Sequence, residues 1–328
     1  MTKVVPEPFN EIILPAVRDI LAGNVDDSGI HCESSELKSG ELSRTRLVEK
    51  YSINFESLDF VKKVWEGRDK REFLINKAFS SYTEDLDGKW RFARFPAVYF
   101  AHENEKEGCS IVRFVDGHPL KLKFESSFDV GYCLGEMSRE LSYLFPYKKP
   151  FERGRVRNLN VSVEEKRLDF IGGSQRKTVL SVLEKFNSRK SEIDAWMRSA
   201  KRAFCHNDVK PANLLAVGSD QGVERYYFLD WASGGWDSLG SDIGGVFFQN
   251  AFERFEEAGQ ASEVQDRIVD GFLEGYGVAL SPAEREELLI AANLHFFVRF
   301  FPWAVKSTRK DLLSRVLKRA NHLIDVFG

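Results

Sequence analysis

The feature that most constrains this chain is a polar cluster set between two apolar runs. Residues 204–215 read FCHNDVKPANLL, with His206, Asp208 and Asn213 in the pattern H-x-D-x-x-x-x-N. Apolar residues on both sides of such a segment anchor it between buried elements, so the polar residues fall on a short loop whose ends are fixed. The bland alternative is that Asp208 and Asn213 are ordinary turn residues, because this short pattern also arises by chance.

A second carboxylate follows at a spacing that suits a metal site. Residues 226–231, YYFLDW, predict an apolar strand ending at Asp230, seventeen residues after Asn213. Phosphoryl transfer needs these residue types: Asp208 can orient a substrate hydroxyl and accept its proton, and Mg²⁺ takes oxygen ligands such as those of Asn213 and Asp230. Asp230 could instead simply end the strand, but the combined spacing of loop and strand favours the metal site.

Composition describes a folded protein without a strong charge bias. Of 328 residues, 43% are hydrophobic and 30% are charged, and the net charge is −3. We expect no nucleic-acid partner, because phosphate attraction needs a basic surface. We expect no membrane association either, since the longest apolar clusters are too short to cross a bilayer and no signal peptide follows Met1. Four cysteines without a CxxC spacing predict reduced thiols and hence a cytoplasmic protein.

The hydrophobic pattern divides the chain into regions. Short runs with strand period surround one charged, amphipathic helix up to about residue 115; the strands are expected at 47–53, 58–64, 97–102 and 110–115, and the helix at 68–82. Helical spacing dominates afterwards, at 128–145, 179–204 and 284–326, with short strands near 214–217 and 226–229. We therefore predict an α+β fold in three parts: a helical extension over 1–34, a small, mostly-sheet lobe over 35–115 and a larger, mainly helical lobe over 116–328.

Together, the two motifs resemble a known family. The segments HNDVKPANLL and FLDWASGGWDSLGSDIGG are similar to those of the aminoglycoside phosphotransferase and choline kinase superfamily, the small-molecule relatives of protein kinases. The resemblance implies a bilobal protein-kinase-like fold, with 35–115 binding the nucleotide and 116–328 carrying catalysis and the substrate site. It also implies that ATP is the phosphate donor, that Asp208 is the catalytic base and that Asn213 and Asp230 bind Mg²⁺.

Three further residues near the catalytic loop receive roles from the resemblance. Asp242 matches a later aspartate that steadies the loop through backbone hydrogen bonds. His206 would support the loop, or be a plain core residue. Lys210, followed by Pro211, matches protein kinases rather than many antibiotic kinases. It could contact the γ-phosphate, and it keeps a protein acceptor open as an alternative to a small molecule.

The resemblance also assigns a lysine to the α/β-phosphates. Either Lys62 or Lys63 could serve, and we favour Lys63 because strand alternation then puts Val61 on the same face, where it could line the adenine site. Glu72 on the next helix would be the ion-pair partner of that lysine. The alternative is that both lysines are simply solvated.

Two other segments are assigned to the nucleotide. Gly40 and Ser43 lie where the family has its nucleotide-positioning loop, although an ordinary hairpin turn is an equal alternative. Residues 111–116, IVRFVD, would be the interlobe linker whose backbone reads adenine, with Val112 and Phe114 beside the base.

Aromatic residues are the candidates for an acceptor pocket. Trp231, Trp236 and Trp303, with Phe300 and Phe301, could form a cage for an amine through cation–π attraction. Such a stripe is also typical of a helix core. The sequence therefore predicts an ATP- and Mg²⁺-dependent kinase acting on a small-molecule hydroxyl, in an amino alcohol, aminoglycoside or sugar. The alternatives are a protein kinase-like enzyme and a non-catalytic nucleotide-binding scaffold.

Overall fold

A computed structural model describes residues 16–22, 30–33, 45–53, 58–66, 72, 74–75, 78, 93–103, 107–146, 168, 171–218, 224–250, 254–255, 258–306 and 310–327. By its contacts the chain divides into two compact units. The first unit comprises Met1–Pro119 and Ala212–Gly234, and the second comprises Leu120–Pro211 and Gly235–Gly328. The division predicted from the sequence, 1–34, 35–115 and 116–328, stays a prediction.

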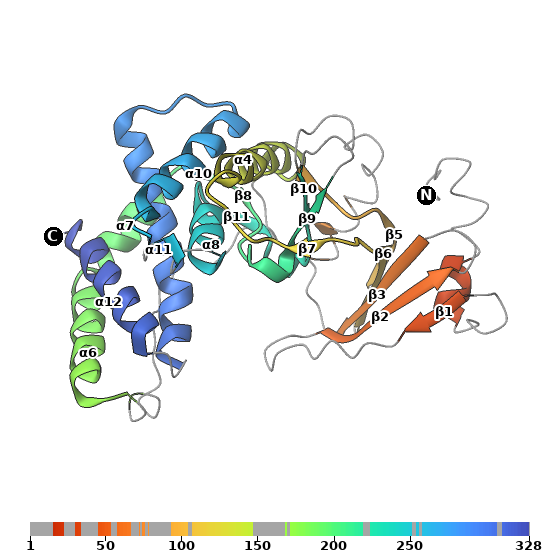
Figure 1. The fold of residues 1–328 in the computed structure, drawn as a ribbon, viewed down its shortest axis with the longest axis horizontal. Helices are drawn as coiled ribbons and strands as arrows, with labels where there is room; N and C mark the ends of the chain where they lie inside the picture. The colour runs from red at the N-terminus through yellow and green to blue at the C-terminus, as the bar shows by residue number, and fades with distance from the viewer. Residues whose placement is uncertain are drawn as a thin grey trace. The chain divides into compact units, whose positions relative to one another are not determined.

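The first unit contains a five-stranded antiparallel sheet (Figure 1). In spatial order its strands are β1 (Ile30–Glu33), β2 (Thr45–Ile53), β3 (Leu58–Glu66), β6 (Glu107–Arg113) and β5 (Val98–Glu103). One face carries Tyr51, Phe60 and Ile111, which pack against Val17 and Ile20 of a helical segment at 16–22. Because side chains alternate along β3, the opposite face is left for Val61 and Lys63.

A second, four-stranded sheet in the same unit comes from distant parts of the chain. Its order is β4 (Ala93–Arg94), β10 (Glu224–Phe228), β9 (Leu214–Gly218) and β7 (His118–Pro119). The hairpin β9–β10 is flanked by two 3₁₀ turns, η1 (Pro211–Asn213) and η2 (Trp231–Ser233). The backbone N–H of Leu229 donates to the carbonyl of Asn213 at 2.9 Å, so the end of β10 lies beside the start of β9.

The second unit is mainly helical, with one two-stranded ribbon (Figure 1). Its helices are α4 (Ser127–Leu144), α6 (Gly173–Ser188), α7 (Lys190–Ser199), α8 (Ser241–Asn250), α10 (Ala261–Tyr276), α11 (Pro282–Lys306) and α12 (Lys310–Asp325). The ribbon pairs β8 (Arg202–Cys205) with β11 (Gly235–Ser238). No helix in the described part of the chain has the length and apolar character needed to cross a membrane.

Helices α4 and α10 touch backbone to backbone through four glycines. A Cβ atom added to Gly135 would lie 2.1 Å from the carbonyl oxygen of Phe272, and one added to Gly271 would lie 2.0 Å from that of Phe128. Gly131 and Gly275 meet carbonyls of the facing helix at equally short range. Each helix carries its two glycines four residues apart, on one face, so any larger residue at these sites would separate the helices.

The fold class predicted from the sequence is confirmed, and one segment differs. Residues 179–204 were expected to be one helical region, but they form most of α6, then α7, and finally enter β8. The helix ends at Ser199, and the run from Ala203 to Cys205 is fully buried as a strand. A short, continuously apolar run has no period of its own, so its pattern could not separate strand from helix. Cys109, Cys133 and Cys205 are free thiols.

Candidate active site

Lys63 on β3 is the centre of an ionic cluster within the first unit. Its Nζ atom lies 2.6 Å from Glu72 Oε1 and 3.1 Å from Asp230 Oδ1. Glu72 is only 4% exposed. Burial lowers the pKa of the Lys63 ammonium, but the Glu72 and Asp230 carboxylates outweigh that effect and hold the pKa above its usual value. Lys63, the lysine favoured from strand alternation, is therefore a fixed positive charge tied to Glu72.

Asp230 combines a strained backbone with an accessible carboxylate. It has φ 58° and ψ 74°, in the left-handed region, which aspartate tolerates better than most residues. Its side chain is 40% exposed although one oxygen contacts Lys63. Strained residues of this kind cluster at functional sites. Asp230 can therefore accept a further ligand while the Lys63 contact fixes its orientation.

Asn213 and Asp230 fit a magnesium site whose remaining ligands would be phosphate and water oxygens. Asn213 is 5% exposed, and its carbonyl accepts the bond from Leu229, the residue before Asp230. Mg²⁺ is usually held by one or two carboxylates, with water and phosphate oxygens completing its coordination. Within the described ranges, no group of three or more His, Cys, Asp or Glu residues could hold a metal ion alone. The side-chain amide of Asn213 and the carboxylate of Asp230 are oxygen donors of the kind that Mg²⁺ takes.

The catalytic-loop motif lies in the second unit, directly after β8. Asp242, at the start of α8 and 2% exposed, accepts two backbone hydrogen bonds, from His206 N to Oδ2 and from Asn207 N to Oδ1, each 2.7 Å long. These are bonds of the kind that the family resemblance implied for Asp242. One buried carboxylate thus fixes two successive peptide groups of the loop.

His206 and Lys210 both contact the residue assigned as the base. The backbone N–H of Asp208 donates to His206 Nδ1 at 3.3 Å, so the fully buried imidazole acts as an acceptor at that atom. Lys210 Nζ lies 3.0 Å from Asp208 Oδ2. The Asp208 side chain is 25% exposed, so its carboxylate is partly accessible while it contacts the Lys210 ammonium.

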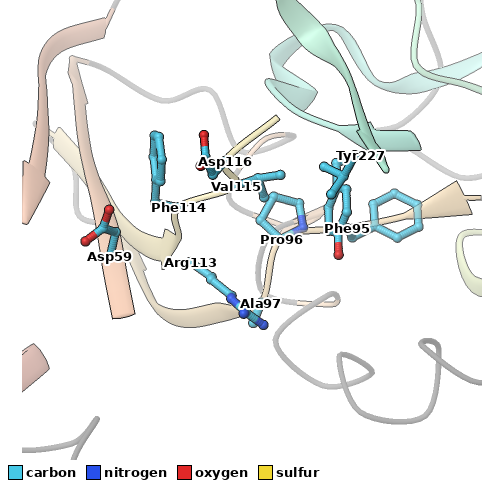
Figure 2. Close-up of a pocket in the computed structure, with 10 residues that line it drawn as sticks. Asp59, Phe95, Pro96, Ala97, Arg113, Phe114, Val115, Asp116 and Tyr227 are labelled. Carbon is cyan, nitrogen blue, oxygen red and sulfur yellow. The ribbon is translucent and has the colours of Figure 1, made fainter. Parts of the chain in front are cut away.

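A pocket of about 440 Å³ lies beside the linker in the first unit (Figure 2). It is lined by Asp59, Phe95, Pro96, Ala97, Arg113, Phe114, Val115, Asp116, Val217 and Tyr227. Figure 2 shows Phe114 and Asp59 on one side and Phe95 and Tyr227 on the other. The Phe114 N–H donates to the Asp59 carbonyl at 2.7 Å, and Lys50 Nζ lies 4.2 Å from the centre of the Phe114 ring. The linker is therefore held from β2 and β3, and the pocket's size is that of a small-molecule site.

The structure places the remaining predicted residues in various settings. Val112 pairs with Val61 across β3 and β6 but does not line the pocket. Lys62 lies on the face of β3 opposite Lys63, as alternation requires. Gly40 and Ser43 fall outside the described residues.

The aromatic acceptor candidates are mostly structural where the structure describes them. Trp231 is 3% exposed and packs on Phe95, with ring centres 5.5 Å apart. Trp236 donates its indole N–H to the Phe145 carbonyl at 2.7 Å. Phe301 is fully buried in the helical core, as the core interpretation of that stripe expected. The side chains of Trp303 and Phe300 lie outside the described part.

Sequence reasoning missed two elements of the site. The pocket is assembled from β3, the segment before β5, the end of β6 with the linker after it, β9 and β10, and no local pattern joins such segments. The second omission is Asn207, whose backbone has a positive φ of 64°. Its residue type was a usable signal, because asparagine is one of the few residues that adopt this conformation readily.

Solved structures match this chain over nearly its whole length, whereas no protein-family model and no curated protein matches its sequence. The GDP and kanamycin complex of APH(2")-IIia has a TM-score of 0.56 at 13% identity, covering 94% of this chain and 98% of its own. An aminoglycoside phosphotransferase from Alicyclobacillus acidocaldarius has a TM-score of 0.54 at 12% identity, covering 100% and 95%. Spectinomycin phosphotransferase APH(9)-Ia, in complex with ADP and spectinomycin, has a TM-score of 0.50 at 14% identity, covering 91% and 92%.

These matches identify the class of fold. The chain has the kinase-like fold of the aminoglycoside phosphotransferases, which confirms the family resemblance seen in the two motifs at the level of the fold.

Proposed function

We propose that the protein is an ATP- and Mg²⁺-dependent phosphotransferase that moves the γ-phosphate to a hydroxyl of a small molecule, in an amino alcohol, an aminoglycoside or a sugar. The observation that carries this proposal is the cluster of Lys63, Glu72 and Asp230, a permanently charged ammonium tied to one buried and one accessible carboxylate. The structural neighbours, with bound GDP, ADP, kanamycin and spectinomycin, support it.

The first unit would bind the nucleotide. Lys63 would contact the α/β-phosphates, and Asn213 and Asp230 would hold Mg²⁺, which neutralises phosphate charge when it is bound. The adenine ring of the nucleotide would enter the pocket beside the linker. Val217 in its wall lies on β9, four residues after Asn213 at the end of η1, which is about 13 Å at the rise of a β-strand. That separation suits the length of a nucleotide from its base to its terminal phosphate.

The catalytic loop would supply the base. Asp208 accepts the proton of the acceptor hydroxyl, whose oxygen forms the new bond to the γ-phosphorus while the bond to the bridging oxygen of ADP breaks. Lys210, 3.0 Å from Asp208, can exchange this contact for a γ-phosphate oxygen. Little covalent chemistry is asked of the protein, so the rate would depend on positioning and on charge stabilisation.

The test is ADP release from Mg-ATP across a panel of amino alcohols, aminoglycosides and sugars, with Asp208→Asn as the control. An acceptor that stimulates the wild type but not the control supports the proposal and gives the acceptor class. Mg-ATP binding without stimulation by any acceptor contradicts a small-molecule kinase. Intact mass after incubation with a test protein then separates the protein-kinase alternative, suggested by Lys210-Pro211, from a non-catalytic scaffold.

A further inference from the structure

The residue between His206 and Asp208 has an unusual backbone. Asn207 is 1% exposed and has φ 64°, and in the described part of the chain it shares a positive φ only with Asp230 and with glycines. A left-handed conformation costs asparagine less than other side chains. The chain therefore turns sharply at Asn207, and this turn sets the direction of the backbone at the next residue, Asp208.

The Asn207 side chain ties that turn to both strands of the ribbon. Its Nδ2 atom donates to the carbonyls of Cys205 and Gly235, each at 3.2 Å. Cys205 is the last residue of β8, Gly235 is the first of β11, and the two are opposite each other in the register. The Asn207 carboxamide thus bridges the two strands of the ribbon at their terminal residue pair, Cys205 and Gly235.

The oxygen of the same carboxamide makes no hydrogen bond to the described residues, unlike its nitrogen. Asn207 Oδ1 is buried and has no hydrogen-bond partner among the residues the structure describes. A buried unsatisfied acceptor costs about 1–3 kcal/mol. The Asn207 side chain therefore contributes through its two N–H donors and its tolerance of positive φ, and not through its oxygen.

We infer that Asn207 is a positioning residue for Asp208, an inference that rests on the proposed function. Three constraints meet at Asn207: the amide bonds to the ribbon, the backbone N–H bond to Asp242 and the left-handed turn. The next peptide N–H, that of Asp208, is held by His206. A displacement of about 1 Å in a reacting group can cost about 10²-fold in rate, so a loosened Asn207 lowers turnover without touching the substrate.

Three substitutions separate the conformational from the hydrogen-bonding role. Asn207→Gly keeps the positive φ and removes the donors, Asn207→Ala removes the donors and strains the turn, and Asn207→Asp keeps the shape but places a carboxylate oxygen against two carbonyls. We expect kcat to fall about 10- to 100-fold for Asn207→Gly and further for the other two. The KM for Mg-ATP should stay within about twofold, because Lys63 and Asp230 belong to the other unit. The matched control is Asn187→Gly at an exposed position on α6, which should leave kcat unchanged.

Hydrogen exchange of the peptide spanning 204–211 adds a readout that needs no turnover. Asn207→Gly should speed exchange in that peptide while leaving the hairpin at 214–228 as in the wild type. An active wild type with unimpaired Asn207→Gly turnover overturns this inference alone. Reduced turnover with uniformly faster exchange throughout the second unit also overturns it, because the role is then merely structural. A wild type that transfers phosphate to no acceptor overturns the proposed function, and with it this inference.

Discussion

The substitution Gly135→Ala should destabilise the protein although alanine is the better helix former. In an open helix the exchange would gain about 1 kcal/mol from backbone propensity. Here the new methyl group would lie 2.1 Å from the Phe272 carbonyl oxygen, more than 1 Å inside ordinary van der Waals contact. The obstacle is backbone of α10, which cannot rotate away as a side chain does, so α4 and α10 must separate. Overpacking of this kind costs about 1–3 kcal/mol, and the loss of close packing along both helices places the change at the upper end. We expect a net loss of about 2 kcal/mol.

The assay is urea denaturation of the full chain followed by far-UV circular dichroism. Gly173→Ala on α6 is the matched control, since a Cβ atom there has no neighbour within 4 Å, and the same exchange should stabilise the protein by about 0.5–1 kcal/mol. The double variant Gly135→Ala/Gly271→Ala should lose less than the sum of its parts, because helices that have separated for one methyl group accommodate the second. Equal midpoints for Gly135→Ala and Gly173→Ala would refute the steric argument.

Three further predictions concern charged groups. Lys63→Ala should weaken Mg-ADP binding at least about tenfold by calorimetry, and Lys62→Ala, on the opposite face of β3, should not; equal effects would contradict the assignment of Lys63. Asp242→Asn should cost about 1–3 kcal/mol in the free energy of unfolding and lower kcat, because the two backbone N–H groups bind different carboxylate oxygens and a carboxamide replaces one of these with an NH2 donor; unchanged turnover would count against a steadying role. Burial raises the pKa of Asp59, but hydrogen bonds from Lys50 and Ser52 outweigh this effect and hold the pKa below its usual value of 3.8. The ionised Asp59 therefore stabilises the fold at pH values above 3.8, and this contribution is lost as the pH falls through the pKa of the folded state. Asp59→Asn should therefore cost up to about 1 kcal/mol at pH 7 and nothing in strong acid, and a pH-independent difference would contradict the ion pair.

Local chemistry made part of the site predictable from the sequence. The spacing of Asp208, Asn213 and Asp230 defined a loop and a strand end, because a polar residue flanked by apolar runs has few places to lie. Strand alternation put Lys62 and Lys63 on opposite faces of β3 without choosing between them, and the structure pairs Lys63, the lysine we favoured, with Glu72 at 2.6 Å. Such inferences work where one element, or two adjacent ones, determine the geometry.

The remainder depends on contacts that no short window contains. The pocket draws on residues as far apart as Asp59 and Tyr227, so its lining follows from the topology of two sheets. The strand at 202–205 was hidden because its burial comes from pairing with β11, thirty residues later. The sequence contains the glycines of α4 and α10 as two pairs four residues apart, but only the structure shows that the two pairs face each other.

The membership of Ala212–Gly234 in the first unit limits how this protein can be recombined. The chain crosses between the units at three points, after Pro119, Pro211 and Gly234. A chimera made by a single exchange at the first crossing would carry Lys63 and Glu72 from one parent and Asp230 from the other, and would mate a β4 strand with a foreign β10. An exchange that preserves the ionic cluster must transplant both segments at once. A chimera that takes each unit whole from one parent therefore needs crossovers at all three points, and libraries of shuffled variants should be designed around these units.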